Sequence, residues 1–229
     1  ISFANEIIIV DSQSTDQTVN IAKSYGAKVE ITTDWPGFGP QKNRALNLAT
    51  QDWVLSIDAD ERVTPELKQE ILDVMESSAS KDCYAIPRSS WYCGRFMKHS
   101  GWYPDYVDRL FKRGTAKFSD HFVHERLLPN GEVAQLKNHF LHYSFRDFSQ
   151  VLKKIDVYST ASANEAFKKG KRSSVGKAVS HAIWAFFRTY FLRLGFLDGP
   201  QGLALAISNA EGTYYRYIKI WLLQQGIDK

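Results

Sequence analysis

The most informative segment of the chain runs Trp53-Val54-Leu55-Ser56-Ile57-Asp58-Ala59-Asp60-Glu61. Its first five residues are apolar apart from one serine, and they predict a buried β-strand. Asp58 and Asp60 follow, and because side chains alternate along an extended chain, both carboxylates should lie on one side. A hard cation such as Mg²⁺ or Mn²⁺, shared with substrate phosphate oxygens, would relieve their repulsion. The alternative is a solvated acidic loop, because this spacing is common.

Strands and helices alternate around this segment up to about residue 81. We predict a helix that begins at the N-cap Ser14 and ends at Gly26, a loop over the Pro- and Gly-rich residues 35–40, and a helix opened by Thr64 and Pro65. This alternation predicts a largely parallel sheet flanked by helices, with Asp11 and Asp58 at the edge where such sheets bind ligands. The other predicted elements are strands at 7–10 and 28–32 and a helix at 41–50.

The pattern changes after residue 81. Strands are predicted at 83–88, 106–112 and 135–141, without intervening helices, so the sheet should be completed in mixed or antiparallel fashion. Ser144 and Asp147 suggest a capping box, and the pattern is helical from there to the end of the sequence. We therefore expect an α/β domain over residues 1–145 and a helical region over residues 146–229.

Composition narrows the possible classes of protein. The chain has 229 residues, 44% of them hydrophobic, which favours a packed domain with an appendage. Cys83 and Cys93 form no Cys-x-x-Cys pair, so we expect neither a disulfide framework nor a zinc site. No signal peptide is visible, and the net charge of +4 is mild. These features predict a cytoplasmic protein that does not bind nucleic acid.

A second notable segment covers residues 177–197. It is rich in Ile, Trp, Phe and Leu, but its charged residues argue against a membrane-spanning helix. One interpretation is an amphipathic helix on an anionic membrane surface, aided by the basic cluster at residues 168–172. The other is a helix packed on the domain with solvated cations.

Several motifs occur in a characteristic order along the chain. They are Ile-Val-Asp-Ser-x-Ser-x-Asp from Ile9, Gln41-Lys42-Asn43-Arg44, Asp58-Ala59-Asp60, Gly101-Trp102-Tyr103-Pro104-Asp105, Arg109-Leu110-Phe111, Val123-His124-Glu125-Arg126 and Gly195-Phe196-Leu197-Asp198-Gly199. Their order resembles the family 2 glycosyltransferases, which have the GT-A fold. The resemblance covers residues 5 to about 145 and is closest to the branch that adds a sugar to the inner core of bacterial lipopolysaccharide or lipooligosaccharide.

The resemblance implies roles for residues near the nucleotide. Asp11 would hydrogen-bond the uracil ring, with Ser12 beside it. Asp58 would face the ribose or diphosphate, and Asp60 would hold the metal together with Asp58. Lys42 would lie near the nucleotide, although a cation on a surface helix is often only solvated.

An inverting transferase also needs one general base near the acceptor hydroxyl. Glu125 is the first candidate, Asp120 the second and Asp105 a distant third. The alternative for Glu125 is a surface ion pair with Arg126 or Arg109.

Three further residues are assigned by the same resemblance or by their chemistry. His142 is a candidate ligand of the metal or diphosphate, although a histidine at a strand end is often structural. Trp102 could stack on a sugar face or fill the core. Arg109 is assigned to substrate or nucleotide binding.

These observations predict a metal-dependent inverting hexosyltransferase. It would move a hexose, with glucose from UDP-glucose as the first candidate, onto a heptose of the lipopolysaccharide inner core, at the cytoplasmic face of the bacterial inner membrane. One alternative acceptor is polyprenyl phosphate, and another possibility is a non-catalytic membrane-surface module with a degenerate nucleotide fold. Family 2 chains normally have a strand and a helix before the position of Ile1, so we expect the sequence to be a truncated record.

Overall fold

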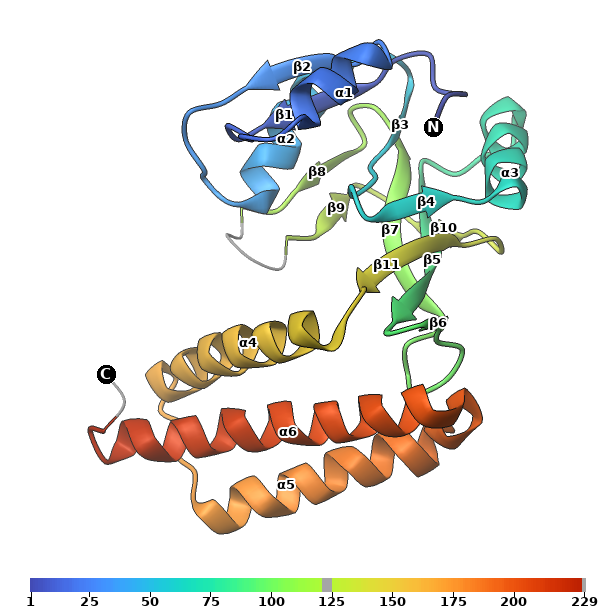
Figure 1. Ribbon diagram of the computed structural model, residues 1–229. Coiled ribbons are helices and arrows are strands. Elements are labelled where there is room, and N and C mark those ends of the chain that lie inside the picture. The colour runs from blue at the N-terminus through green and yellow to red at the C-terminus, as the bar shows by residue number, and fades with distance from the viewer. Residues whose placement is uncertain (121–124, 228–229) are drawn as a thin grey trace. The chain divides into compact units, whose positions relative to one another are not determined.

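The computed structural model describes residues 1–120 and 125–227 (Figure 1). The chain forms two compact units, Ile1–Pro87 with Tyr106–Phe140, and Arg88–Asp105 with Leu141–Lys229. The structure is mixed α/β with a C-terminal helical region, as the sequence predicted. The division of the chain into domains at residue 145 stays a prediction.

The first unit begins with a small parallel sheet. Strand β1 (Ile8–Asp11) pairs with β2 (Lys28–Ile31), and α1 (Thr18–Ser24) connects them. The predicted N-cap at Ser14 is wrong, because α1 begins later and Ser14 instead donates hydrogen bonds to the side chain of Asp11. Gly26 follows the helix with φ of 76°, a left-handed conformation that suits glycine and ends the helix as predicted.

Helix α2 (Phe38–Leu48) begins inside the segment for which the sequence predicted a loop. Pro40 lies in its first turn, where the backbone nitrogen needs no partner within the helix, so proline is tolerated there. Gly39 has a steric reason, because a Cβ atom at this position would lie 1.8 Å from the carbonyl oxygen of Ser119. The glycine therefore lets α2 approach the backbone of residue 119 closely.

The prediction of one parallel sheet that contains β1 and β3 is wrong. Strand β3 (Trp53–Leu55) pairs antiparallel with β7 (Asp105–Lys112), in a sheet separate from β1 and β2. Helix α3 (Pro65–Glu76) begins as predicted, with the Thr64 hydroxyl accepting a hydrogen bond from the Leu67 nitrogen at 3.1 Å.

The larger sheet is mixed, and in the described residues its strand order is β3-β7-β5-β11-β4, with β6 and β10 also paired to β5. The predicted strand at 135–141 is wrong in its bounds, because the chain forms two strands there. The remaining strands are β4 (Glu61–Val63), β5 (Cys83–Tyr92), β6 (Arg95–Phe96), β10 (Val133–Gln135) and β11 (Phe140–Phe145), with β8 (Ala116–Phe118) and β9 (Leu127–Pro129) as a separate antiparallel pair. The core of the first unit includes Leu67, Ile71, Ile86, Leu110 and Phe140.

The second unit is mainly helical. It contains α4 (Phe148–Lys168), α5 (Val175–Phe187), the π-helical segment η1 (Arg188–Leu192), the 3₁₀ segment η2 (Gly195–Asp198) and α6 (Gly199–Gln224). Helices α4 and α5 both pack against α6 (Figure 1). Asp147 caps α4 by accepting a hydrogen bond from the Gln150 nitrogen at 3.0 Å, whereas Ser144, its predicted partner in a capping box, contacts His142. No helix within the described residues has the length and apolar character needed to cross a membrane.

A fully buried carboxylate organises the turn before α6. The side chain of Asp198 accepts hydrogen bonds from the backbone nitrogens of Lys98 at 3.1 Å and His99 at 2.9 Å, and from the Ser100 hydroxyl at 3.2 Å. A Cβ atom at Gly202 would lie 1.8 Å from the carbonyl oxygen of Gly195. The hydrogen bonds of Asp198 and the absence of a side chain at Gly202 therefore allow a tight turn within the second unit.

Candidate active site

The Asp-x-Asp segment forms a hydrogen-bonded turn between β3 and β4. The backbone nitrogen of Glu61 donates to the carbonyl oxygen of Asp58 at 3.0 Å, and the Glu61 carboxylate accepts from the Asp58 nitrogen at 2.9 Å. Glu61 is only 2% exposed, so its carboxylate is a structural part of the turn. Glu61 had no role assigned from the sequence, in which its one signal is its position directly after the two aspartates.

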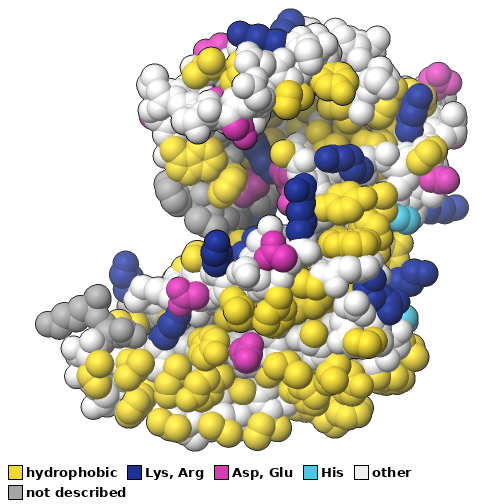
Figure 2. All heavy atoms as spheres, in the orientation of Figure 1, with side chains coloured by type: hydrophobic (Ala, Val, Ile, Leu, Met, Phe, Trp, Pro, Cys, Tyr) yellow, Lys and Arg dark blue, Asp and Glu magenta, His cyan; other side chains and the backbone are white. Residues whose placement is uncertain are grey.

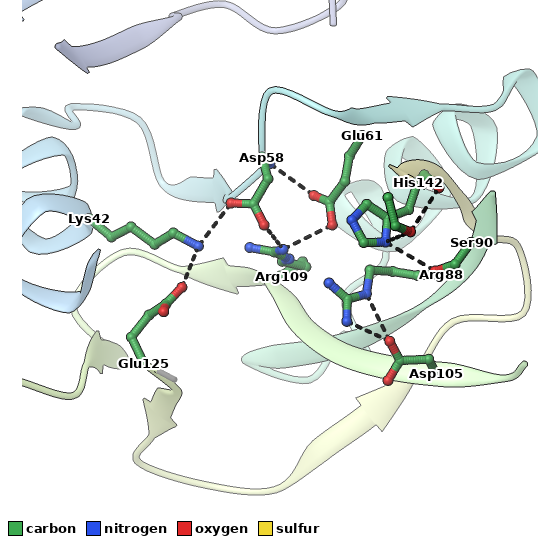
Figure 3. A network of polar contacts seen from close by, with 10 residues as sticks. Lys42, Asp58, Glu61, Arg88, Ser90, Asp105, Arg109, Glu125 and His142 are labelled. Atoms are coloured by element: carbon green, nitrogen blue, oxygen red, sulfur yellow. Dashed lines mark hydrogen bonds and ion pairs between the residues drawn. The ribbon is translucent and has the colours of Figure 1, made fainter. Parts of the chain in front are cut away.

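Arg109 on β7 neutralises this buried carboxylate. Its guanidinium donates to Glu61 at 2.9 Å and also contacts Asp58 (Figure 3). Arg109 is 5% exposed, and although this burial alone would lower its pKa, the charges of Asp58 and Glu61 raise the pKa above its ordinary value. Arg109 is thus permanently charged and holds the Asp-x-Asp turn on β7.

Lys42 connects the turn to Glu125. Its ammonium nitrogen lies 2.9 Å from a carboxylate oxygen of Asp58 and 2.9 Å from one of Glu125. In Figure 3 the lysine extends from α2 to a position between the two acids. Within the described residues, Glu125 forms an ion pair with Lys42 and not with Arg126 or Arg109, the alternative considered from the sequence.

The protonation state of Asp58 follows from these neighbours. Burial would raise its pKa, but the positive charges of Arg109 and Lys42 outweigh burial and lower the pKa to about 2. The carboxylate is therefore ionised at neutral pH, and it can interact with a cation.

Helix α2 is fixed by polar side chains that belong to the motif at residues 41–44 but had no role assigned from the sequence. The amide of Asn43 donates to the Phe118 carbonyl at 2.9 Å and accepts from the Phe118 nitrogen at 2.8 Å. Gln41 is buried, and its amide donates to the hydroxyls of Ser12 at 2.9 Å and Thr32 at 2.7 Å. These contacts position Lys42, which lies between the two residues on the helix.

Asp11 and Ser12 lie at the end of β1. The carboxylate of Asp11 is buried and accepts from the backbone nitrogen of Ser14 at 2.8 Å and from its hydroxyl at 2.5 Å. Asp11 therefore stabilises its own turn, and Ser12 is held by Gln41. The role of both residues at the uracil ring stays a prediction.

Two other candidates belong to the first unit. Asp60 is half-buried at the tip of the turn, and Asp120 is exposed after β8. Val123 and His124, the first two residues of the motif that contains Glu125, lie outside the described residues. Ion pairs connect four of the candidates in the described residues, namely Asp58, Lys42, Arg109 and Glu125. Their proposed catalytic and binding roles stay predictions.

Three candidates belong to the second unit. The Nδ1 atom of His142 lies 3.0 Å from the Ser90 hydroxyl and 3.1 Å from that of Ser144. The ring of Trp102 packs against Tyr92, with 5.6 Å between ring centroids, in the core of this unit. Asp105 accepts hydrogen bonds from Arg88 at 3.0 Å and 2.5 Å. The contacts of Trp102 match its core-filling interpretation, whereas sugar stacking and the metal role of His142 stay predictions.

The comparison with protein families agrees with the order of these motifs. The profile described as Glycosyl transferase family 2 matches residues 3–130, more than half of the chain. The chain is a family 2 glycosyltransferase. This membership confirms the predicted enzyme class and GT-A fold class, and it disfavours the non-catalytic module.

Curated relatives of this family 2 glycosyltransferase cover almost the whole chain. An uncharacterized glycosyltransferase, RT0209 of Rickettsia typhi, is 32% identical over 231 residues, which are 96% of this chain and 78% of the relative. The lipopolysaccharide core biosynthesis glycosyltransferase LpsC of Rhizobium meliloti is 29% identical over 230 residues, 93% of this chain and 83% of LpsC. Among solved structures, S. aureus TarS 1–349 in complex with UDP aligns with a TM-score of 0.45 and 15% identity, over 96% of this chain and 82% of that chain.

Proposed function

We propose that this glycosyltransferase transfers a hexose from a UDP-sugar, with UDP-glucose as the first candidate, onto a heptose of the lipopolysaccharide inner core. The observation that carries the proposal is the ion-pair network in which Lys42 joins Glu125 to Asp58. The similarity to LpsC over 93% of the chain supports the lipopolysaccharide acceptor.

Glu125 is the proposed general base. The oxygen of the acceptor hydroxyl attacks the anomeric carbon, its proton passes to the Glu125 carboxylate, and the diphosphate leaves with the electron pair of the broken C–O bond. Attack opposite to the leaving group inverts the anomeric centre. A positioned base of this kind contributes typically about 10²–10⁴-fold to the rate.

Lys42 and Arg109 supply the positive charge of the site. Lys42 reaches both the proposed base and the Asp-x-Asp turn, so it can donate to a phosphate oxygen of the donor and stabilise charge on the leaving diphosphate. Arg109 is buried and paired twice, so its proposed task is to orient Asp58.

The residues present are compatible with a divalent cation. Asp58 is ionised, and the network sets three carboxylates, those of Asp58, Glu61 and Glu125, against the two cations Lys42 and Arg109, with Asp60 as a further acid. In the described parts of the chain no three potential ligands are grouped as a ready metal site. Magnesium is commonly held by one or two carboxylates together with substrate phosphates, so Asp58 and Asp60 are the proposed protein ligands. A bound metal would neutralise charge on the leaving diphosphate.

A cytoplasmic location is part of the proposal. Both cysteines are free thiols, and free thiols are compatible with a reducing compartment. The acceptor is proposed to be reached at the cytoplasmic face of the inner membrane.

A donor and acceptor screen tests the proposed function. The purified chain is incubated with Mn²⁺, one UDP-sugar at a time, and either heptose-containing core oligosaccharide or polyprenyl phosphate, and products are detected by mass spectrometry. The expected result is a one-hexose mass increase on the core oligosaccharide only. Transfer to polyprenyl phosphate alone, or to neither acceptor from any UDP-sugar, would contradict the proposed acceptor.

A further inference from the structure

The segment between Glu165 and Asp198 has an unusual charge composition. It contains seven Lys and Arg residues and not a single Asp or Glu, in a chain whose overall net charge is only +4. It covers the end of α4, all of α5, η1 and most of η2. The cations are Lys168, Lys169, Lys171, Arg172, Lys177, Arg188 and Arg193. This segment would attract an anionic surface.

The same segment exposes many large apolar side chains. On α5, residues Val175, Val179, Ile183 and Phe187 recur every fourth position and form one arc of the helix surface. Ten large apolar residues of the segment are between 44% and 65% exposed. Four of these ten are the residues of the arc, and the other six are Trp184, Phe191, Leu192, Leu194, Phe196 and Leu197. Soluble proteins rarely leave an apolar surface of this extent uncovered unless it binds something.

The exposed arc is not the face by which α5 folds. The helix packs against α6 and buries Ala178 and Ala185, which lie on another side of the helix. Lys177, His181 and Arg188 are exposed and lie about 80–120° beyond Phe187 around the helix axis, on the side where the His181 ring stacks on Tyr217 of α6. In Figure 2 hydrophobic side chains cover most of the surface in the region where Figure 1 draws α5.

We infer that α5 and the turn that follows it dock on the surface of an anionic lipid bilayer. The apolar arc enters the interface between headgroups and acyl chains, and the cations of the segment, including the cluster at residues 168–172 before α5, contact the anionic headgroups. Helices that lie in a membrane surface have this distribution, with Lys and Arg on the polar face and Trp, Phe and Leu on the other. A second copy of the chain fits less well, because an isologous contact would bring the two sets of cations together.

Vesicle flotation tests this inference with a matched pair of variants. Ile183→Glu places an acid on the arc, and Val157→Glu makes a similar change on α4, where Val157 is equally exposed at 62% against 65%. The vesicles contain phosphatidylcholine with one third phosphatidylglycerol. We expect Ile183→Glu to reduce binding about tenfold or more and Val157→Glu to bind like the wild type, because apolar burial contributes to interfacial binding. Equal binding of Ile183→Glu and the wild type would overturn the inference.

The contribution of charge is tested separately. A variant with glutamine at Lys168, Lys169, Lys171 and Arg172 should bind the same vesicles more weakly and lose much of the dependence on salt, because charge attraction near a membrane is screened within a Debye length. Wild-type binding that is equal on vesicles of pure phosphatidylcholine would contradict the role of anionic lipid.

The fluorescence of Trp184 in the wild type provides a test that does not depend on whether a charged variant folds. Trp184 is exposed on α5, so lipids brominated on their acyl chains should quench its fluorescence in the wild type. Trp184→Phe provides the control, because it should remove most of the quenching. Unquenched Trp184, or a dimer in sedimentation that Ile183→Glu dissociates without any vesicle binding, would refute membrane docking. These measurements use neither donor nor acceptor, so their failure is separate from a failure of the proposed function.

Discussion

The ammonium nitrogen of Lys42 is equidistant, at 2.9 Å, from carboxylate oxygens of Asp58 and Glu125. Asp58 follows β3, whereas Glu125 precedes β9, more than sixty residues later in the chain. One side chain of α2 therefore connects the proposed general base to the proposed metal-binding turn. This relationship gives separate expectations for each of the three residues.

Removal of the proposed base should affect chemistry more than binding. We expect Glu125→Gln to lower kcat by about 10²–10⁴-fold, because proton removal from the acceptor is lost, while the dissociation constant for UDP changes little. Isothermal titration with UDP and single-turnover kinetics measure the two effects. Asp120→Asn is the matched control and should keep near-normal kcat. A large loss in Asp120→Asn with little effect of Glu125→Gln would reverse the assignment.

Removal of the Lys42 ammonium should weaken the donor site. A charge-assisted hydrogen bond contributes about 1.5–3 kcal/mol, so Lys42→Met should reduce kcat/KM for the donor by about 10- to 100-fold. The matched control is Lys23→Met, because Lys23 is exposed on α1. An unchanged kcat/KM in Lys42→Met would show that the lysine only pairs with the two acids.

Arg109 should matter for stability because it compensates a buried acid. In Arg109→Met the Glu61 carboxylate, whose side chain is fully buried, would lose its ion-pair partner. Breaking a buried pair from one side typically costs about 3–5 kcal/mol, so the urea midpoint should fall clearly. The double variant Arg109→Met/Glu61→Gln should recover part of this loss. No recovery would mean that the unpaired charge of Glu61 is not the cause.

Stability should decrease in acid partly through Asp58. Its pKa is lowered from 3.8 to about 2 in the folded protein, so the unfolded chain binds the proton more readily. The stabilisation is therefore present above pH 4 and is lost as the pH falls towards 2. Asp58→Asn should flatten the dependence of Tm on pH in this window.

Glu6 provides the necessary control for this experiment. Its pKa is also lowered to about 2, first by a hydrogen bond from Lys28, and it would contribute to the same acid transition. The comparison is therefore made in a Glu6→Gln background. An Asp58→Asn curve parallel to that background would contradict the lowered pKa.

Metal dependence is tested through ligand-induced stabilisation. UDP with Mn²⁺ should raise the Tm of the wild type, because a ligand that binds only the folded state stabilises it. Asp60→Ala or excess EDTA should remove most of this shift. Asp52→Asn, an exposed aspartate just before β3, is the control and should keep it. A UDP shift that persists in EDTA would argue against a metal in donor binding.

Local sequence signals predicted some elements well. Thr64 and Pro65 marked the start of α3 because a cap and a first-turn proline act within a few residues. The same type of signal failed at Ser14, whose hydroxyl bonds to Asp11 instead of capping α1. It failed at Pro40 as well, because a proline in a first helical turn cannot be distinguished from a loop proline without knowledge of what packs nearby.

The polar partners in the site were beyond local reasoning. Glu61 is paired with Arg109, which is 48 positions away in the sequence, and the Gln41 amide bridges hydroxyls 29 and 9 positions away. Such pairs depend on tertiary contacts between segments, so the sequence suggested Lys42, Arg109 and the aspartates of the turn, but not the contacts among them or the roles of Glu61 and Gln41. The separation of β1 and β3 into two sheets was missed for the same reason.

Gln41 and Lys42 are consecutive residues with different partners: Gln41 contacts Ser12 and Thr32, and Lys42 contacts Asp58 and Glu125. The rotational orientation of α2 therefore determines at the same time the contacts of Gln41 after β1 and β2 and the contacts of Lys42 with the Asp-x-Asp turn and Glu125. A single residue inserted or deleted upstream in that helix would turn these side chains by about 100°. Length variation among related sequences should consequently be confined to the loops before and after α2.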